Sequence, residues 1–215
     1  AEEKLRAVAS NEMDRELEEG VALEAEELKM HFGGVKAVDG LSFKVHEGEI
    51  FGLIGPNGAG KTTTIRHLLG FLRPEKGSCR ILGMDCFHEA AVIQKSLGYL
   101  AGEIAFPEDC TGDGLLRLLA EMKGIKDKSR MRELMELLEL DPSGRVRKMS
   151  KGMKQKLGIV NAFMGNPEIV ILDEPTSGLD YDSMVRVSRL IEQLSASGVI
   201  VFVVSHDFEF IVRTC

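Results

Sequence analysis

The 215-residue chain has no tryptophan, only four cysteines and no long hydrophobic run. Its longest purely apolar run near the C-terminal end covers only residues 199–204. A membrane-spanning helix needs roughly 18 or more apolar residues, so no such helix is expected. The cysteines form no C-x-x-C pair and have no histidine at zinc-site spacing, which favours reduced thiols over a metal site.

An excess of basic residues is also missing. Lysine and arginine number 27 against 34 aspartates and glutamates, giving a net charge of −7. Residues 1–30 hold ten acidic and four basic residues, so most of the charge lies there and the remainder is nearly neutral. Proteins that clamp nucleic acid usually present a basic face, so no nucleic-acid partner is expected. The acidic start has neither the basic nor the apolar region of a signal peptide, which predicts a cytoplasmic protein.

The remaining composition is that of a globular protein, with 44% hydrophobic and 28% charged residues. Residues 1–20 favour helix but have a thin apolar stripe, and we interpret them as an appended helix or tail. Residues 21–110 and 165–215 are expected to form an α/β core. Residues 111–164 change to a helical period and are expected to form an inserted helical subdomain, with one helix starting near Ser150.

Continuous apolar runs predict the strands of that core. Residues 50–54, 169–172 and 199–204 are typical of strands buried on both faces, as in a parallel sheet. Residues 80–82 are a shorter candidate of the same kind. Before the first run, residues 21–46 contain two β-like stretches around the turn Phe32-Gly33-Gly34, which predict a small antiparallel edge.

A glycine-rich turn follows residues 50–54 and leads into a lysine and two threonines. Glycines permit the positive torsions that turn several N–H groups toward one point, and the next helix adds its dipole there. The pattern predicts a polyphosphate site in which Lys61 reaches the β and γ phosphates and Thr62 is a ligand of Mg²⁺. An ordinary turn with a surface lysine is the less favoured alternative. The nucleotide-binding candidates in this loop are Gly55, Pro56, Asn57, Gly58, Ala59, Gly60, Lys61, Thr62 and Thr63.

Two adjacent carboxylates, Asp173 and Glu174, follow the apolar run 169–172. Alternating side-chain directions along a strand send them to different neighbours, so they can have separate roles. We expect Asp173 to complete the Mg²⁺ shell beside Thr62 and Glu174 to polarise a water aimed at the γ phosphate. A solvated strand end would explain the pair equally well if the phosphate loop were absent.

Four motifs follow one another in the chain: G-P-N-G-A-G-K-T-T at 55–63, M-S-K-G-M at 149–153, I-V-I-L-D-E-P-T-S-G-L-D at 169–180 and V-S-H-D at 204–207. With these motifs, residues 21–215 resemble an ATP-binding subunit of an ABC transporter. The second motif stands where that family has its signature L-S-G-G-Q, with Ser150 and Gly152 matching. This variant resembles exporter-type members, whereas the sequence from Asp180 onward resembles the ATPases of vitamin or metal-ion importers.

The resemblance implies a P-loop NTPase fold and Mg²⁺-dependent ATP hydrolysis coupled to transport. It implies that two such subunits, identical or related, sandwich ATP and energise a separate membrane-spanning permease from the cytoplasmic face of the membrane. The signature variant implies export as the direction of transport, with an importer-type ATPase as the alternative.

The resemblance also implies roles for residues outside the phosphate loop. Ser150 and Gly152 would bind the γ phosphate across the subunit interface, and His206 would hold the γ phosphate and the attacking water. Asp180 ends the segment that couples the two sites, and Phe32 would stack on adenine. In the structural alternatives, His206 is a polar strand end and Phe32 is ordinary packing.

Two departures from the family pattern stand out. Gly102 and Glu103 occupy the place of a glutamine that senses Mg²⁺ and contacts the membrane subunit, and Glu103 is a weak candidate to replace it. The family continues beyond the helix after His206 with further strands, whereas this chain runs from Ala1 to Cys215. We therefore expect a fragment that lacks the C-terminal strands.

Two other function classes remain as alternatives. An ABC-type ATPase outside transport would act in translation or DNA repair, but such members usually carry a second nucleotide domain, a long coiled coil or a zinc insertion. A small-molecule kinase or GTPase with the same phosphate loop would leave residues 149–153 and His206 without a role.

Overall fold

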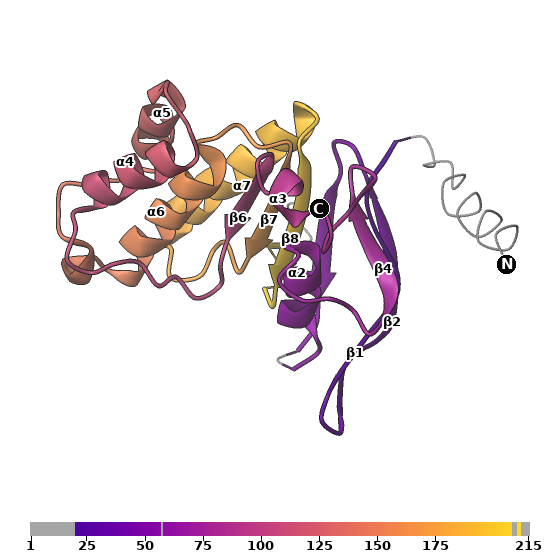
Figure 1. The fold of residues 1–215 in the computed structure, drawn as a ribbon. Coiled ribbons are helices and arrows are strands. Elements are labelled where there is room, and N and C mark those ends of the chain that lie inside the picture. Colours follow the sequence, from indigo (N-terminus) through magenta and orange to yellow (C-terminus); the bar gives the residue numbers. More distant parts are fainter. Residues whose placement is uncertain (1–19, 57, 208–209, 212–215) are drawn as a thin grey trace, which may run out of the picture.

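The computed structural model describes residues 20–56, 58–207 and 210–211, which form two sheets and a group of helices (Figure 1). The first sheet has the order β2-β1-β4-β5 and is antiparallel throughout. Its strands are β1 (Val21–Phe32), β2 (Val35–His46), β4 (Lys76–Ile81) and β5 (Met84–Asp85). The hairpin of β1 and β2 confirms the predicted antiparallel edge.

The prediction that residues 80–82 belong to the parallel sheet is wrong. Arg80 and Ile81 end β4, which pairs antiparallel with β1 and β5, and Leu82 follows in the turn. Leu82 and Gly83 both have positive φ, 51° and 77°, as a two-residue hairpin turn requires. Parallel strands need a long crossover connection. A turn of two residues can therefore join only antiparallel strands.

The second sheet is parallel, with the order β3-β8-β7-β6. Its strands are β3 (Ile50–Ile54), β6 (Leu97–Leu100), β7 (Ile169–Asp173) and β8 (Ile200–Ser205). The predictions for residues 50–54, 169–172 and 199–204 are confirmed to within a residue. Strand β6 was not predicted as a strand, because Gly98 interrupts its short apolar run.

Helices surround the parallel sheet. They are α2 (Lys61–Leu68), α3 (Ala90–Ile93), α4 (Gly112–Met122), α5 (Ser129–Leu137), the short η1 (Val146–Lys148), α6 (Lys151–Phe163) and α7 (Tyr181–Ala196). Figure 1 shows α4, α5 and α6 grouped beyond β6, while α2 lies beside the antiparallel sheet. Within the described residues, no helix is both long enough and apolar enough to span a bilayer.

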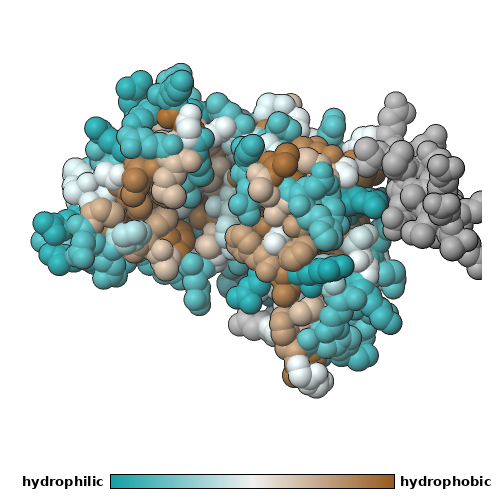
Figure 2. Space-filling view, viewed as in Figure 1, coloured by the Kyte–Doolittle hydropathy of each residue, from teal (hydrophilic) through white to brown (hydrophobic). Residues whose placement is uncertain are grey.

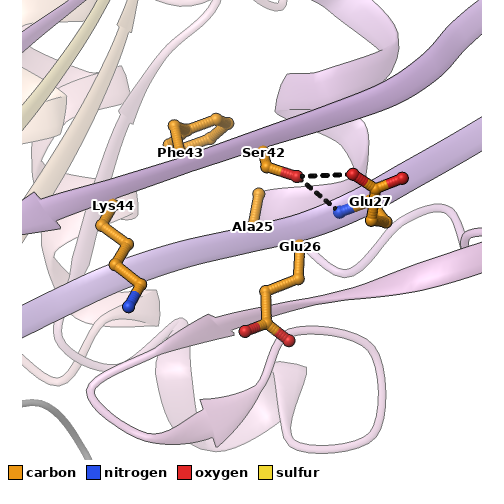
Figure 3. A pocket seen from close by; sticks show the side chains of 6 residues that line it. All are labelled: Ala25, Glu26, Glu27, Ser42, Phe43 and Lys44. Carbon is orange, nitrogen blue, oxygen red and sulfur yellow. Dashed lines mark hydrogen bonds between the residues drawn. The ribbon is translucent and has the colours of Figure 1, made fainter.

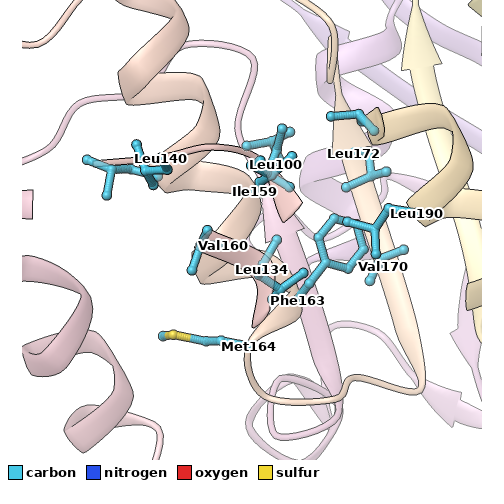
Figure 4. Packing of buried hydrophobic residues seen from close by; sticks show 14 of the residues in the cluster. Leu100, Leu134, Leu140, Ile159, Val160, Phe163, Met164, Val170, Leu172 and Leu190 are labelled. Carbon is cyan, nitrogen blue, oxygen red and sulfur yellow. The ribbon is translucent and has the colours of Figure 1, made fainter. Parts of the chain in front are cut away.

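Alternate side chains of β7 and β8 pack into two different hydrophobic cores. Val170 and Leu172 pack with residues of α6 and the helical group, whereas Ile169 and Ile171 pack with residues of the antiparallel sheet and α2. Figure 4 shows the first core, with Phe163 of α6 near these strands. Because β7 and β8 are covered on both faces, only their ends can carry exposed polar groups.

Candidate nucleotide-binding and catalytic site

The predicted phosphate loop joins the end of β3 to the start of α2. Gly60 stands directly before α2 with φ +88°, and its carbonyl accepts hydrogen bonds from the backbone and hydroxyl of Thr64. A Cβ atom on Gly60 would lie 2.1 Å from the carbonyl oxygen of Ala37 in β2. Residue 60 therefore has no room for a side chain, and the loop lies directly against β2.

Lys61 extends back across this loop. Its ammonium donates hydrogen bonds to the carbonyl of Gly55 and, at 2.9 Å, to that of Pro56. The ammonium group is thus held beside the loop by two neutral carbonyl oxygens. A negatively charged phosphate oxygen can take their place and form a stronger hydrogen bond. Thr62 is exposed and Thr63 is half-buried. Pro56, Gly58 and Ala59 are also exposed, while Asn57 lies outside the described residues.

Asp173 ends β7 and is half-buried. Burial raises the pKa of its carboxyl and Glu174 adds to the rise, while the Gly102 amide and the Lys61 charge oppose it. A Cβ atom on Gly102 would lie 2.9 Å from Oδ2 of Asp173, so the carboxylate fills the space that a side chain at 102 would occupy. Residue 102, where the resemblance predicts a glutamine, thus has only backbone beside Asp173, and Glu103 is exposed.

The chemistry of this edge of the sheet fits Mg²⁺ bound together with phosphate. Mg²⁺ favours a few oxygen ligands from the protein, with waters and phosphate oxygens completing the shell. The Thr62 hydroxyl and the Asp173 carboxylate carry oxygen atoms of the kind that bind Mg²⁺. No group of three or more His, Cys, Asp or Glu side chains suited to a metal occurs among the described residues.

Glu174, immediately after Asp173, is held by residues at the end of β8. Its backbone has a positive φ of 50°, and its amide donates to the carbonyl of Val204 in β8 at 2.8 Å. One carboxylate oxygen accepts from the Ser205 hydroxyl at 3.0 Å. The other accepts from the backbone amide of His206 at 2.9 Å and lies 2.7 Å from its Nδ1. The end of β8 therefore fixes the direction of this carboxylate.

His206 presents the rest of its ring to solvent, since its side chain is 73% exposed. Its Nδ1 contacts Glu174, so Nε2 is the ring nitrogen that this contact does not use. The structure thus brings Lys61, Asp173, Glu174 and His206 to the carboxyl ends of β3, β7 and β8, which are neighbouring strands.

The residues of the second motif lie elsewhere. Ser150 caps α6, and its hydroxyl accepts from the Met153 amide at 3.2 Å, so the predicted helix start is confirmed. A Cβ atom on Gly152 would lie 2.7 Å from the carbonyl oxygen of Gly178. Helix α6 packs on β6, at the opposite edge of the parallel sheet from β3. The structure therefore does not bring Ser150 and Gly152 to this chain's own phosphate loop.

Comparison with known proteins identifies the family. Residues 38–177, more than half of the chain, match the family model described as ABC transporter. The chain belongs to the ABC transporter family.

Relatives within this family agree over most of the chain. The bacitracin transport ATP-binding protein BcrA of Bacillus licheniformis is 38% identical over 183 residues, which cover 84% of this chain and 60% of that protein. The Nod factor export ATP-binding protein I of Paraburkholderia xenovorans is 35% identical over 90% of this chain and 66% of its own length. The chain thus spans about two thirds or less of these relatives.

The fold agrees as well. A solved ATP-binding subunit of an ABC transporter superposes with a TM-score of 0.81 at 31% identity, covering 90% of this chain and 83% of that one. The expected fold class, a P-loop core with a parallel sheet, a small antiparallel sheet and helices, is therefore confirmed.

Two further predicted residues of this ABC protein lie at turns. Asp180 caps α7 by accepting from the Ser183 amide at 2.8 Å, and hydrogen bonds from Ser183 lower its pKa. Phe32 ends β1 at the hairpin and is 47% exposed. Nearby Val35 is 68% exposed, and Figure 2 shows hydrophobic surface toward this end of the molecule.

A pocket of about 490 Å³ lies on the antiparallel sheet away from these residues (Figure 3). It is lined by Ala25, Glu26, Glu27, Ser42, Phe43 and Lys44, none of which was a predicted site residue. The Ser42 hydroxyl accepts from the Glu27 amide where β1 bulges. The candidate site is thus formed by strand ends and not by this pocket.

The sequence interpretation missed two residues that contact the site. Ser205 is fully buried and donates to Glu174. Gln155 is 2% exposed and contacts the backbone at Glu174. The sequence spacing does indicate Gln155. It lies four residues before the buried Ile159, which places it on the buried face of α6.

Proposed function

We propose that this chain is the ATP-hydrolysing part of an ABC transporter. Two copies, or this chain and a related one, close around ATP and drive a separate membrane-spanning permease from its cytoplasmic face. The observation that carries the proposal is the Glu174 carboxylate, held by Ser205 and His206 at the sheet edge where Lys61 and Asp173 also lie.

The ATP phosphates would bind to the loop between β3 and α2. Lys61 would leave the carbonyls of Gly55 and Pro56 for the β and γ phosphates, and the loop amides would bind the remaining oxygens. The exposed ring of Phe32 would stack on adenine, because β2 continues from this hairpin to the contact with Gly60.

Thr62 and Asp173 would hold Mg²⁺, which supplies charge neutralisation at the β and γ phosphates when bound. Glu174 would accept a proton from the attacking water. Its contacts with Ser205 and His206 orient the carboxylate before ATP arrives, so little reorganisation is needed. His206 would contact the γ phosphate through the exposed part of its ring.

The second subunit follows from the separation of the two motifs. The N-terminus of α6, with Ser150 and Gly152, offers amides and a helix dipole for an anion. Within one chain it lies across the sheet from β3. A partner related by rotation would place its α6 over this chain's phosphate loop. The segment ending at Asp180 packs beside Gly152 and would lie at the same interface.

Export is the direction that we propose. BcrA is named for bacitracin transport and the second relative for Nod factor export. The second motif, in which Lys151 and Met153 differ from the usual L-S-G-G-Q, also resembles that of exporter-type members.

Calorimetry with Mg·ATP tests nucleotide binding. The parent protein should give a saturable heat, and Lys61→Ala should weaken binding strongly because the charge at the phosphates is lost. Lys126→Ala, which removes an exposed lysine between α4 and α5, is the control and should bind as the parent does. Unchanged affinity in Lys61→Ala would refute the assignment of the phosphate loop.

The Glu174→Gln variant tests catalysis. It should keep ATP affinity and lose roughly 10²- to 10⁴-fold in hydrolysis rate, the usual contribution of a general base. It should also accumulate a dimer with ATP, measured by light scattering, since the nucleotide is not consumed. Glu168→Gln, an exposed change just before β7, is the control. Hydrolysis at the parent rate in Glu174→Gln would remove Glu174 from its role.

A further inference from the structure

Gln155 connects helix α6 to the backbone of the proposed catalytic residue. Its side-chain amide donates one hydrogen bond to the carbonyl of Glu174 and another to that of Pro175, both at 3.0 Å. The side chain is buried, with 2% of the residue exposed. Both amide hydrogens are therefore used on two consecutive carbonyls beside the catalytic carboxylate.

The backbone that Gln155 contacts is in an unfavourable conformation. Glu174 has φ +50°, a region that side-chain-bearing residues rarely adopt. Such a conformation persists only where its surroundings hold it from several sides. Here Val204 accepts from the Glu174 amide at 2.8 Å, while Ser177 donates to the Glu174 carbonyl at 3.1 Å. Gln155 is the contact that comes from α6.

A second contact joins the same helix to the same turn. The backbone of Gly152 approaches the carbonyl of Gly178 so closely that no Cβ would fit between them. Ser150 caps the helix five residues before Gln155, which is about 7.5 Å along a helix axis. One helix therefore carries the surface proposed to meet the partner's nucleotide and the bonds to this chain's Glu174.

We propose that Gln155 is a positioning residue for hydrolysis: it holds the backbone of Glu174 in the conformation that presents the carboxylate. Because Gln155 belongs to α6, the orientation of Glu174 depends on the position of the signature helix. Docking of α6 on a partner's nucleotide thus sets the geometry of this chain's own catalytic site. The inference rests on the proposed ATP hydrolysis and adds a residue that the sequence pattern did not assign.

The test replaces Gln155 by methionine, which has a similar size and no hydrogen to donate. Gln155→Met should lower kcat by about 10- to 100-fold, because a displacement of the order of 1 Å costs that much in a positioned group. Its KM and its equilibrium affinity for Mg·ATP should stay at the parent values, since no phosphate contact is lost. The control is Gln193→Met, at an exposed glutamine of α7, which should leave all three quantities unchanged.

A double variant separates positioning from general damage. If Gln155 acts through Glu174, adding Gln155→Met to Glu174→Gln should cause no further loss in single-turnover hydrolysis. A further loss equal to that in the parent background would overturn the proposal, as would a rise in KM with kcat unchanged. If Gln155→Met does not fold, Gln155→Asn keeps the amide but shortens its reach, and the same loss of kcat is expected.

The two proposals fail in different ways. A parent protein that neither binds nor hydrolyses Mg·ATP would refute the proposed function. A parent that hydrolyses ATP, with Gln155→Met and Gln155→Asn both as fast as the parent, would refute only the role of Gln155.

Discussion

Replacement of Gly60 by alanine tests the close contact between the phosphate loop and the antiparallel sheet. The change imposes two costs. An alanine at φ +88° adopts the left-handed region, which costs about 1–2 kcal/mol. Its Cβ would also lie 2.1 Å from the carbonyl oxygen of Ala37, where real Cβ contacts are never closer than 3.0 Å. The loop or β2 must therefore move by about 0.9 Å, and such overpacking costs about 1–3 kcal/mol more.

The expected loss for Gly60→Ala is thus about 2–5 kcal/mol in the free energy of unfolding. For a chain of this length, that lowers Tm by about 4–20 °C. Two matched variants separate the terms. Gly58→Ala has φ +84° with open space around its Cβ and should show only the torsional cost. Gly144→Ala, with open space and no positive φ, should be nearly neutral or slightly stabilising.

Urea unfolding and thermal melting measure the loss of stability in the three variants. The order of stability loss should be Gly60→Ala, then Gly58→Ala, then Gly144→Ala. A loss in Gly60→Ala no larger than that in Gly58→Ala would mean that β2 does not press on the loop.

Three further outcomes are expected. Gly102→Ala should weaken Mg·ATP binding about tenfold or more, because its Cβ would displace the Asp173 carboxylate. Binding of ATP without metal should stay unchanged. Equal losses of affinity with and without metal, measured by calorimetry, would contradict this. Burial raises the pKa of the Asp173 carboxyl in the folded protein above its ordinary value. The protonated carboxyl therefore adds to the free energy of unfolding below the ordinary pKa, and this contribution is lost as the pH rises through the raised pKa. Asp173→Asn should therefore raise Tm near pH 7 without nucleotide or metal, and melts repeated toward pH 4 should show this gain shrinking. Cys110, which is partly exposed, should react with a thiol reagent in the folded protein, while the buried Cys79 and Cys86 should react only after unfolding. The hydrogen bond with Cys79, together with burial, raises the pKa of Cys86. Peptide mass spectrometry would locate the label.

Strands β7 and β8 could be predicted because consecutive apolar residues make up all of each strand but its last residue. Residues 169–172 and 199–204 are apolar without a break, and a strand covered on both faces needs that composition. The phosphate loop could also be predicted, since its glycines and Lys61 follow such a strand directly. These features are local, so a sequence pattern suffices for them.

Two features that depend on partners far apart in the chain, strand β6 and the contacts of Gln155, were not predicted. The sequence at Gly98 weakens β6 as a strand, but there a Cβ would lie 2.2 Å from the carbonyl of Ala162 in α6. The glycine therefore permits the packing of helix on strand that the rest of the group needs. Likewise, the bonds of Gln155 to residues 174 and 175 join segments almost twenty residues apart, and no local pattern contains them.

The arrangement explains how the fold keeps Glu174, the proposed catalytic residue, in a strained backbone conformation. Strands β7 and β8 are covered on both faces, so the segment after β7 cannot relax by shifting its strand. The amide of Glu174 is tied to β8, its carboxylate to Ser205 and its carbonyl to Gln155. Each tie comes from an element with its own place in a core. The positive φ of Glu174 is therefore maintained by the packing of the whole sheet, and loosening either α6 or β8 should release it.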